Sequence, residues 1–189
     1  LRSAILPGFL EEDTPLREMR LAKKFTVGRA KPTETFIIFS NEGLTYPNHN
    51  LGMPVSKFSN DAIDNLVIPL RRTVEIYSLR QYFHEINSKD IRSWENCLHK
   101  MKIACLEKSF NKIIECDIEF HRLIVERSNI VDIISIWNLL ISRVQGHFMR
   151  NYHKYRDPME IYFEHEAIFS MFRTGKLDAA IQILESNIE

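Results

Sequence analysis

Residues 16–44 read LREMRLAKKFTVGRAKPTETFIIFSNEGL, and the spacing of their apolar residues indicates the architecture of the N-terminal part of the chain. Apolar side chains recur with helical periodicity in 16–25 and again in 29–44. The segment TVG at 26–28 interrupts the periodicity, and Gly43 is a typical residue for the end of a helix. This pattern predicts two helices joined by a tight turn.

A short β-ribbon is predicted directly after the second helix. Residues 44–56 (LTYPNHNLGMPVS) have the pattern of two short strands around a polar tip, and Gly52 provides the bend. Five of the seven prolines lie in the first sixty residues, which favours short elements and tight turns there. The succession of helix, turn, helix and ribbon predicts a winged helix-turn-helix domain over residues 1–58.

Residues 59–189 are predicted to form a second domain, an all-α antiparallel helical bundle, so the fold class is mainly α. Helical periodicity continues to the end of the chain, and short links place successive helices antiparallel. Ser88 and Asn129 are expected to cap two of the helices, and Gly175 is expected to end another. The predicted helices span residues 69–86, 88–106, 109–127, 129–151, 157–173 and 177–189.

Composition and charge narrow the class of protein. Of 189 residues, 44% are hydrophobic and 26% charged, as in globular proteins, and the formal net charge is zero. Residues 16–36 nevertheless contain six basic residues and two acidic ones, a surplus of four charges that suits DNA phosphates; a solvated helix face is the alternative. No apolar run is long enough to span a bilayer, so no membrane partner is expected. Three cysteines without a CxxC pair fit reduced thiols of a cytoplasmic protein.

Two parts of the chain resemble known domains of bacterial transcription regulators. The DNA-binding domain of the GntR family is similar to AILPGFLEEDTPLRE (4–18), RLAKKFTVGRAKPTETF (20–36) and NEGLTYPNHNLGMPV (41–55). Residues 59–189 resemble the ligand-binding bundle of the FadR-like branch of that family, the FCD domain. The second resemblance is carried by IPLRRTVE (68–75), DIEFHRLIVERSN (117–129) and EHEAIFSMFRTGKLDAA (164–180).

The resemblance implies a homodimeric transcription regulator that binds double-stranded DNA and responds to a small-molecule effector. The residues that it places at the DNA are Arg17, Arg20, Lys23, Arg29, Lys31, Thr33 and Gly52. Thr33 and Met19 stand where the family commonly has arginines, and an arginine–guanine contact contributes about 1–3 kcal/mol of discrimination. These departures imply an unusual operator or weaker DNA binding.

Arg71 and Arg143 match arginines that lie near the effector cavity in the resembling family. A guanidinium can bind a carboxylate through two parallel hydrogen bonds, so these residues imply an organic acid as the effector. An ion pair between subunits or at the surface is an equally open interpretation of each arginine.

The stretch DIEFH (117–121) indicates a candidate metal site. Asp117 and His121 are four residues apart and share one face of a helix. His165 lies on a later helix, and the resemblance implies a fourth ligand at Asn187, where the family usually has histidine. Imidazoles and a carboxylate suit a divalent cation such as Zn²⁺, Ni²⁺ or Mn²⁺. The alternative is a pair of buried, hydrogen-bonded histidines with Asp117 as a local partner.

Two other functions remain open at the level of the sequence. A metal-dependent enzyme could use the same ligands with Glu164 or Glu166 as the base, although it would give no role to the basic helix pair. A sensor that no longer binds DNA is compatible with Thr33 and Met19. The preferred interpretation is a DNA-binding transcription regulator and not an enzyme.

Overall fold

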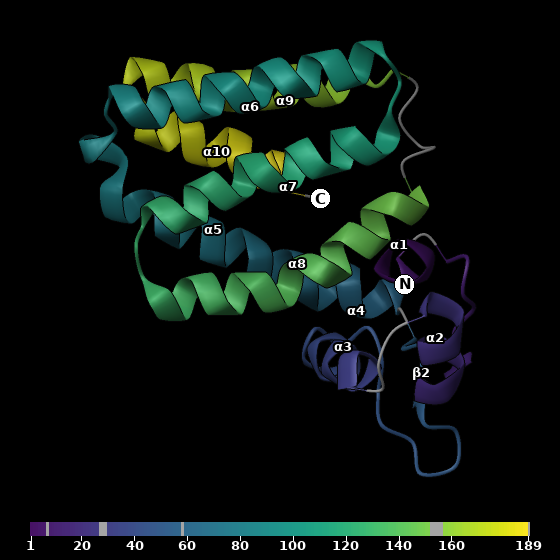
Figure 1. Cartoon of the computed structure of the whole chain (residues 1–189). Coiled ribbons are helices and arrows are strands. Elements are labelled where there is room, and N and C mark those ends of the chain that lie inside the picture. The colour runs from purple at the N-terminus through teal and green to yellow at the C-terminus, as the bar shows by residue number, and fades with distance from the viewer. Residues whose placement is uncertain (7, 27–29, 58, 152–156, 189) are drawn as a thin grey trace.

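The computed structural model describes residues 1–6, 8–26, 30–57, 59–151 and 157–188. A small N-terminal lobe, which contains α2, α3 and β2, lies beside a larger helical bundle (Figure 1). The predicted mainly α class is confirmed, since the described residues form helices in both parts and strands in the lobe alone.

The two helices predicted in the N-terminal part are α2 (Glu18–Phe25) and α3 (Ala30–Asn41). On α3, the apolar periodicity places Phe36 and Phe39 in the core of the lobe. Gly43 has a φ of +67°, a conformation that favours glycine, and α3 ends just before it as predicted. A single helical turn, α1 (Arg2–Ile5), precedes this pair.

The predicted ribbon is present and pairs with a further strand. Two antiparallel bridges close it, Thr45–Val55 and Asn48–Gly52. The sequence did not predict β1 (Pro15–Leu16), which pairs antiparallel with β2 (Met53–Pro54). The predicted helix start at Leu16 is therefore wrong, because this residue is buried in the strand pairing and α2 begins only at Glu18.

The bundle consists of α5 to α10. In its centre, α7 packs against α5, α6 and α8, while α9 packs against α6 and α10; Figure 1 shows α6, α9 and α10 on one side of α7 and α5 and α8 on the other. Two short elements, α4 (Asn60–Ala62) and the π-helix η1 (Ile63–Val67), lead into α5, and the short 3₁₀ helix η2 (Phe83–Glu85) follows it. The long helices are α5 (Ile68–Tyr82), α6 (Ser88–Leu106), α7 (Phe110–Arg127), α8 (Val131–Asn151), α9 (Met159–Thr174) and α10 (Leu177–Asn187).

The helix ends correct two sequence predictions and confirm a third. Asn87, and not Ser88, caps α6, because its side chain accepts backbone N–H groups of the first turn and Asp90 completes a capping box. Asn129 does not cap α8: its φ of +55° is left-handed, and its N–H donates to the end of α7. Gly175 ends α9 with a φ of +67°, as predicted.

Apolar side chains form two core clusters. The larger cluster extends from α6, α9 and α10 into the N-terminal lobe, and the smaller one fills the space between α5, α7 and α8. Trp94 belongs to the first cluster and Trp137 to the second, and both are buried as predicted. Within the described part of the chain, no helix is both long and apolar enough to cross a lipid bilayer.

Candidate functional site

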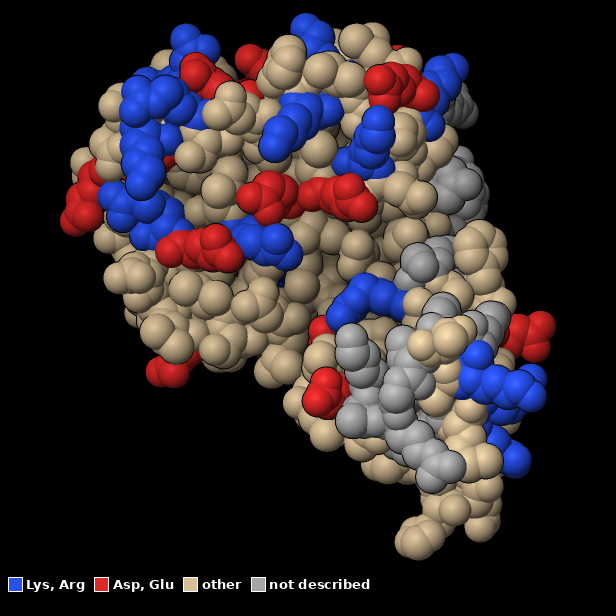
Figure 2. Space-filling view, in the orientation of Figure 1, with Lys and Arg blue, Asp and Glu red and all other residues tan. Residues whose placement is uncertain are grey.

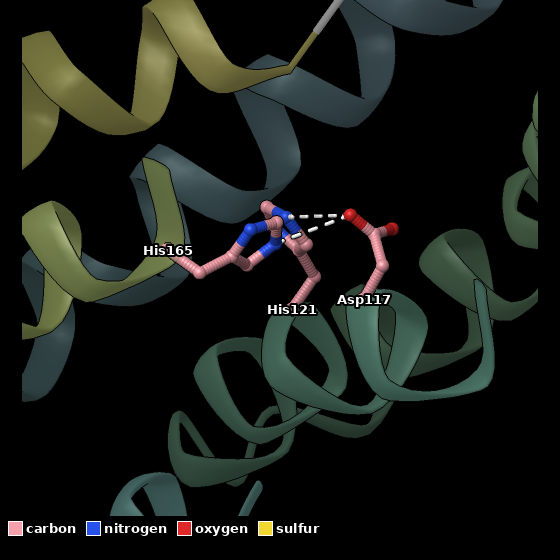
Figure 3. Close-up of side chains that lie close together, drawn as sticks. All are labelled: Asp117, His121 and His165. Carbon is pink, nitrogen blue, oxygen red and sulfur yellow. Dashed lines mark ion pairs between the residues drawn. The ribbon is translucent and has the colours of Figure 1, made fainter. Parts of the chain in front are cut away.

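Three of the predicted metal ligands converge inside the bundle (Figure 3). Helix α7 contributes Asp117 and His121 from consecutive turns, and α9 contributes His165. All three are buried, and one ligand atom from each residue lies within 4.8 Å of the other two. The Asp117 Oδ1 atom is 3.1 Å from His165 Nε2 and 4.0 Å from His121 Nε2.

The tautomer of His121 is set by Glu75, a buried residue of α5. The His121 Nδ1 atom lies 2.6 Å from Glu75 Oε2. Burial on its own would raise the pKa of Glu75, but the Arg71 guanidinium and the contact with His121 outweigh it and lower that pKa to about 2. An ionised carboxylate can only accept, so Nδ1 carries the ring proton. Burial lowers the pKa of His121 itself, and the neutral ring presents the Nε2 lone pair to Asp117.

His165 is held in the same tautomer by its own helix. Its Nδ1 donates to the carbonyl oxygen of Ile161, one turn earlier, at 2.8 Å. Its Nε2 is within ion-pair distance of Asp117, but it is buried and lacks a hydrogen-bond partner among the described residues. In the neutral ring, the Nε2 lone pair and the carboxylate oxygen repel each other at this distance, and a cation between them would remove the repulsion.

The donor atoms fit a divalent metal ion. Two atoms that each bind at about 2.1 Å lie at most about 4.2 Å apart, and both distances from Asp117 Oδ1 satisfy that limit. Burial raises the pKa of Asp117, whereas the nearby Arg71 guanidinium lowers it and favours the ionised carboxylate. An ionised carboxylate and neutral imidazoles are the ligand states that Zn²⁺, Ni²⁺ and Mn²⁺ require. The three side chains therefore form a candidate metal centre.

Glu75 is a candidate functional residue that the sequence interpretation missed. Its Oε1 accepts hydrogen bonds from Arg71 Nε at 2.7 Å and from Trp137 Nε1 at 2.8 Å, while Oε2 contacts His121. One carboxylate thus connects α5, α7 and α8 next to the candidate metal centre. The sequence does contain one sign of this role, because Arg71 and Glu75 have opposite charges and are four residues apart, which places them on one face of a helix. The contacts to His121 and Trp137, however, cross 46 and 62 residues of sequence.

The two predicted effector residues lie in different places. Arg71 is 4% exposed and interacts electrostatically with Asp117, and its buried Nη2 atom has no hydrogen-bond partner in the part of the chain that the structure describes. Arg143 lies where α8 meets the N-terminal lobe. Its Nη1 donates to the Lys57 carbonyl oxygen at 3.2 Å, and a Cβ atom on Gly43 would come within 2.6 Å of its Nη2. An effector-binding role for either residue remains a prediction.

Asn187, the predicted fourth metal ligand, is the last residue of α10. Its Nδ2 donates to Oε2 of Glu164, the residue before His165, at 3.2 Å. Its Oδ1 is buried and has no hydrogen-bond partner among the described residues. Asn187 therefore retains an acceptor atom of the kind that binds cations, and its role as a ligand remains a prediction.

The predicted DNA-binding residues that the structure describes lie on the surface of the N-terminal lobe. Those with exposed side chains or an exposed backbone are Arg17, Arg20, Lys23, Thr33 and Gly52. Gly52 makes the bend of the ribbon with a φ of +79°. Figure 2 shows basic side chains on the outer edge of this lobe, where Figure 1 places α2. Arg29 and the side chain of Lys31 lie outside the described residues.

The chain is similar to known bacterial proteins over its whole length. Residues 67–189 match the family model of the FCD domain. The gluconate operon transcriptional repressor of Bacillus licheniformis is 24% identical over 194 residues, which cover 100% of this chain and 79% of the repressor. The HTH-type transcriptional repressor RspR of Escherichia coli is 24% identical over 195 residues, which cover 100% of this chain and 82% of RspR.

Solved structures share the fold over both the lobe and the bundle. The Escherichia coli protein McbR/YncC has a TM-score of 0.82 at 15% identity, and the match covers 99% of this chain and 89% of that protein. A putative GntR transcriptional regulator from Rhodococcus has a TM-score of 0.77 at 21% identity, with coverage of 99% and 89%.

Proposed function

The chain belongs to the FCD-domain family of GntR-type transcription regulators, and on that basis we propose that it binds duplex DNA through its N-terminal lobe and a divalent cation in its bundle. It is a regulator and not an enzyme, so the metal-dependent enzyme considered from the sequence is set aside. The proposal assigns contacts with phosphates and bases to α2, α3 and the ribbon, which correspond to the elements of a winged helix-turn-helix.

One observation carries the cation proposal: two imidazole Nε2 atoms face the same buried carboxylate oxygen. Both rings carry a proton on Nδ1, so in their neutral form two Nε2 lone pairs and a carboxylate oxygen meet in the interior of the bundle. The proposed ligands are Asp117, His121 and His165, with Asn187 Oδ1 as a fourth. A divalent ion bound there supplies the positive charge that joins α7 to α9.

We propose a small organic acid as the effector. The buried charges around the metal centre are two negative (Glu75 and Asp117) and one positive (Arg71), so a divalent cation changes their sum from negative to positive. A positive interior favours an anion, and Arg71 Nη2 has a donor without a partner in the described structure. Gluconate, the acid in the name of one relative, is a suitable first compound to test.

A homodimer is the proposed assembly. Large apolar side chains are exposed at helical spacing along and just before α5: Leu66 precedes the helix, and Leu70 and Tyr77 lie on it. Ile136 and Leu139 are likewise exposed on α8, which packs against α5. A second copy of the chain could cover these side chains, and it would place two DNA-binding lobes on one assembly.

The proposed switch is a change in the spacing of those two lobes. Dimeric regulators need DNA half-sites that match the separation of their reading elements. Helix α8 is suited to transmit a change, since it contacts Glu75 through Trp137 and the Lys57 carbonyl through Arg143. Thermodynamic linkage makes this coupling reciprocal. If metal or acid changes the affinity for DNA by a given factor, DNA must change the affinity for that metal or acid by the same factor.

Fluorescence anisotropy with DNA from upstream of the protein's own gene tests this function. We expect salt-dependent binding whose Kd changes at least about 5-fold when Zn²⁺, Ni²⁺, Mn²⁺ or gluconate is added to metal-free protein. DNA binding that none of these additions alters would contradict the proposal that a ligand of the bundle controls DNA binding. A lack of salt-dependent duplex binding under all conditions would contradict the proposal that the N-terminal lobe binds DNA.

Arg20→Ala and Lys23→Ala are each expected to weaken DNA binding on all sequences alike. Each substitution removes one proposed phosphate contact from α2 and should reduce the slope of log K against log salt by about 1. Titrations at several salt concentrations measure that slope. Lys89→Ala is the matched control, because it removes an exposed lysine from the bundle. Slopes that stay equal in all four proteins would show that α2 does not face the DNA.

A further inference from the structure

We propose that Glu75 is the positioning residue of the metal centre: it orients His121 for metal binding and connects that ligand to α8 through Trp137. The inference rests on the proposed metal centre and adds a residue that is not itself a ligand. It is drawn from the three contacts of the Glu75 carboxylate in the interior of the bundle.

Both oxygens of Glu75 are engaged, so the carboxylate has little freedom to rotate. Oε1 is fixed by Arg71 from the preceding turn of α5 and by the Trp137 indole from α8. Oε2 is thereby held 2.6 Å from His121 Nδ1. A ring fixed at Nδ1 can turn little about its own axis, and its Nε2 stays directed to Asp117.

The two metal-binding histidines are held differently, which gives Glu75 a particular role. His165 takes its orientation from a carbonyl oxygen of its own helix, so its support moves with α9. His121 takes its orientation from a different helix, and the support is a charged carboxylate. A carboxylate behind a metal-binding histidine fixes the ring and strengthens its donor nitrogen. A metal ion bound to both rings would therefore be connected to α5 and α8 as well as to α7 and α9.

Trp137 makes this connection measurable. Its indole N–H donates to the same oxygen that Arg71 contacts, and the ring is 1% exposed in the core between α5, α7 and α8. Any change in the Glu75 carboxylate when His121 binds metal should alter the environment of the indole. Trp94 is the only other tryptophan of the chain, so Trp94→Phe leaves Trp137 as the sole emitter.

The experiment compares Zn²⁺ affinity and Trp137 fluorescence in the Trp94→Phe protein with and without Glu75→Gln. We expect Glu75→Gln to weaken Zn²⁺ binding about 10–100-fold, measured by competition with a chelating dye. We also expect Zn²⁺ to change the Trp137 emission in the parent protein and to leave it unchanged in the variant at saturating metal. Glu126→Gln, an exposed position on the same helix as His121, is the matched control and should behave like the parent.

A second variant separates positioning from stability. Glu75→Gln leaves the Arg71 charge buried without its partner, so Arg71→Met combined with Glu75→Gln removes both charges at once. The double variant is expected to show the same loss of Zn²⁺ affinity in a folded protein. Parental affinity in the double variant would overturn the role of Glu75.

Asp117→Asn distinguishes a failure of this inference from a failure of the metal centre. If Asp117→Asn abolishes Zn²⁺ binding while the Glu75 variants bind normally, the metal centre stands and the positioning role is wrong. If Asp117→Asn also binds Zn²⁺ with parental affinity, the metal centre is wrong and Glu75 loses its proposed role with it.

Discussion

Saturating Zn²⁺ is expected to raise the melting temperature of the metal-free protein by about 5–10 °C, and Asp117→Asn is expected to abolish that increase. A ligand that binds only the native state at about 100 times its Kd adds about 2.7 kcal/mol to the free energy of unfolding. For a chain of this size, each kcal/mol corresponds to roughly 2–4 °C. Differential scanning fluorimetry after treatment with a chelator, with and without added metal, measures both proteins.

Asp117→Asn is informative because it should remove metal binding without damaging the fold. The amide is nearly isosteric with the carboxylate, and its N–H groups can donate to the two Nε2 lone pairs that now face a negative oxygen. The metal-free variant should therefore melt no lower than the metal-free parent. Asp132→Asn, on the exposed side of α8, is the control and should keep the full metal effect. Equal metal-induced increases in all three proteins would mean that the ion binds elsewhere.

Acid is expected to destabilise the metal-free protein in two separate steps. In the first step, burial holds the pKa of His121 below its ordinary value of 6.5. The unfolded chain therefore binds more protons than the native state just below pH 6.5, and the free energy of unfolding falls as the pH drops. In the second step, the pKa of Glu75 is about 2 instead of the ordinary 4.5. The stability that this ionised carboxylate supplies is complete above pH 4.5 and is lost as the pH falls towards 2.

The second step is expected to remove about 3 kcal/mol over the whole pKa shift of Glu75, since each unit of pKa shift corresponds to about 1.4 kcal/mol. Urea denaturation between about pH 8 and about pH 2 at constant ionic strength follows both steps. Combining Arg71→Met with Glu75→Gln should remove the part of the decrease in the free energy of unfolding below pH 4.5 that the Glu75 carboxylate causes. A urea midpoint of the parent that stays constant over the whole range would contradict the buried, neutral state of His121 and the ionised state of Glu75.

Local patterns in the sequence predicted most of the bundle. Helical periodicity and stop signals such as Gly175 depend on residues a few positions apart, so they are visible without a structure. The same holds for Asp117 and His121, whose spacing places them on one face of α7. The convergence of His165 on that face depended on a family resemblance, and the structure brings the three residues together.

Features that depend on contacts between distant residues were missed. The strand at Leu16 forms because Met53 pairs with it, and nothing in residues 16–25 signals that pairing. The role of Glu75 depends on partners on two other helices, and the position of Arg143 depends on a backbone carbonyl 86 residues away. Asn87 was missed for a smaller reason, because either of two adjacent polar residues could have capped α6.

The metal content of protein purified without chelators tests the proposed centre most directly. Elemental analysis should find about one Zn, Ni or Mn ion per chain in the parent and almost none in His165→Ala, since a small alanine removes a ligand from α9 and leaves two on α7. Equal metal content in the two proteins, or none in either after growth and reconstitution with these ions, would contradict a metal centre at Asp117, His121 and His165.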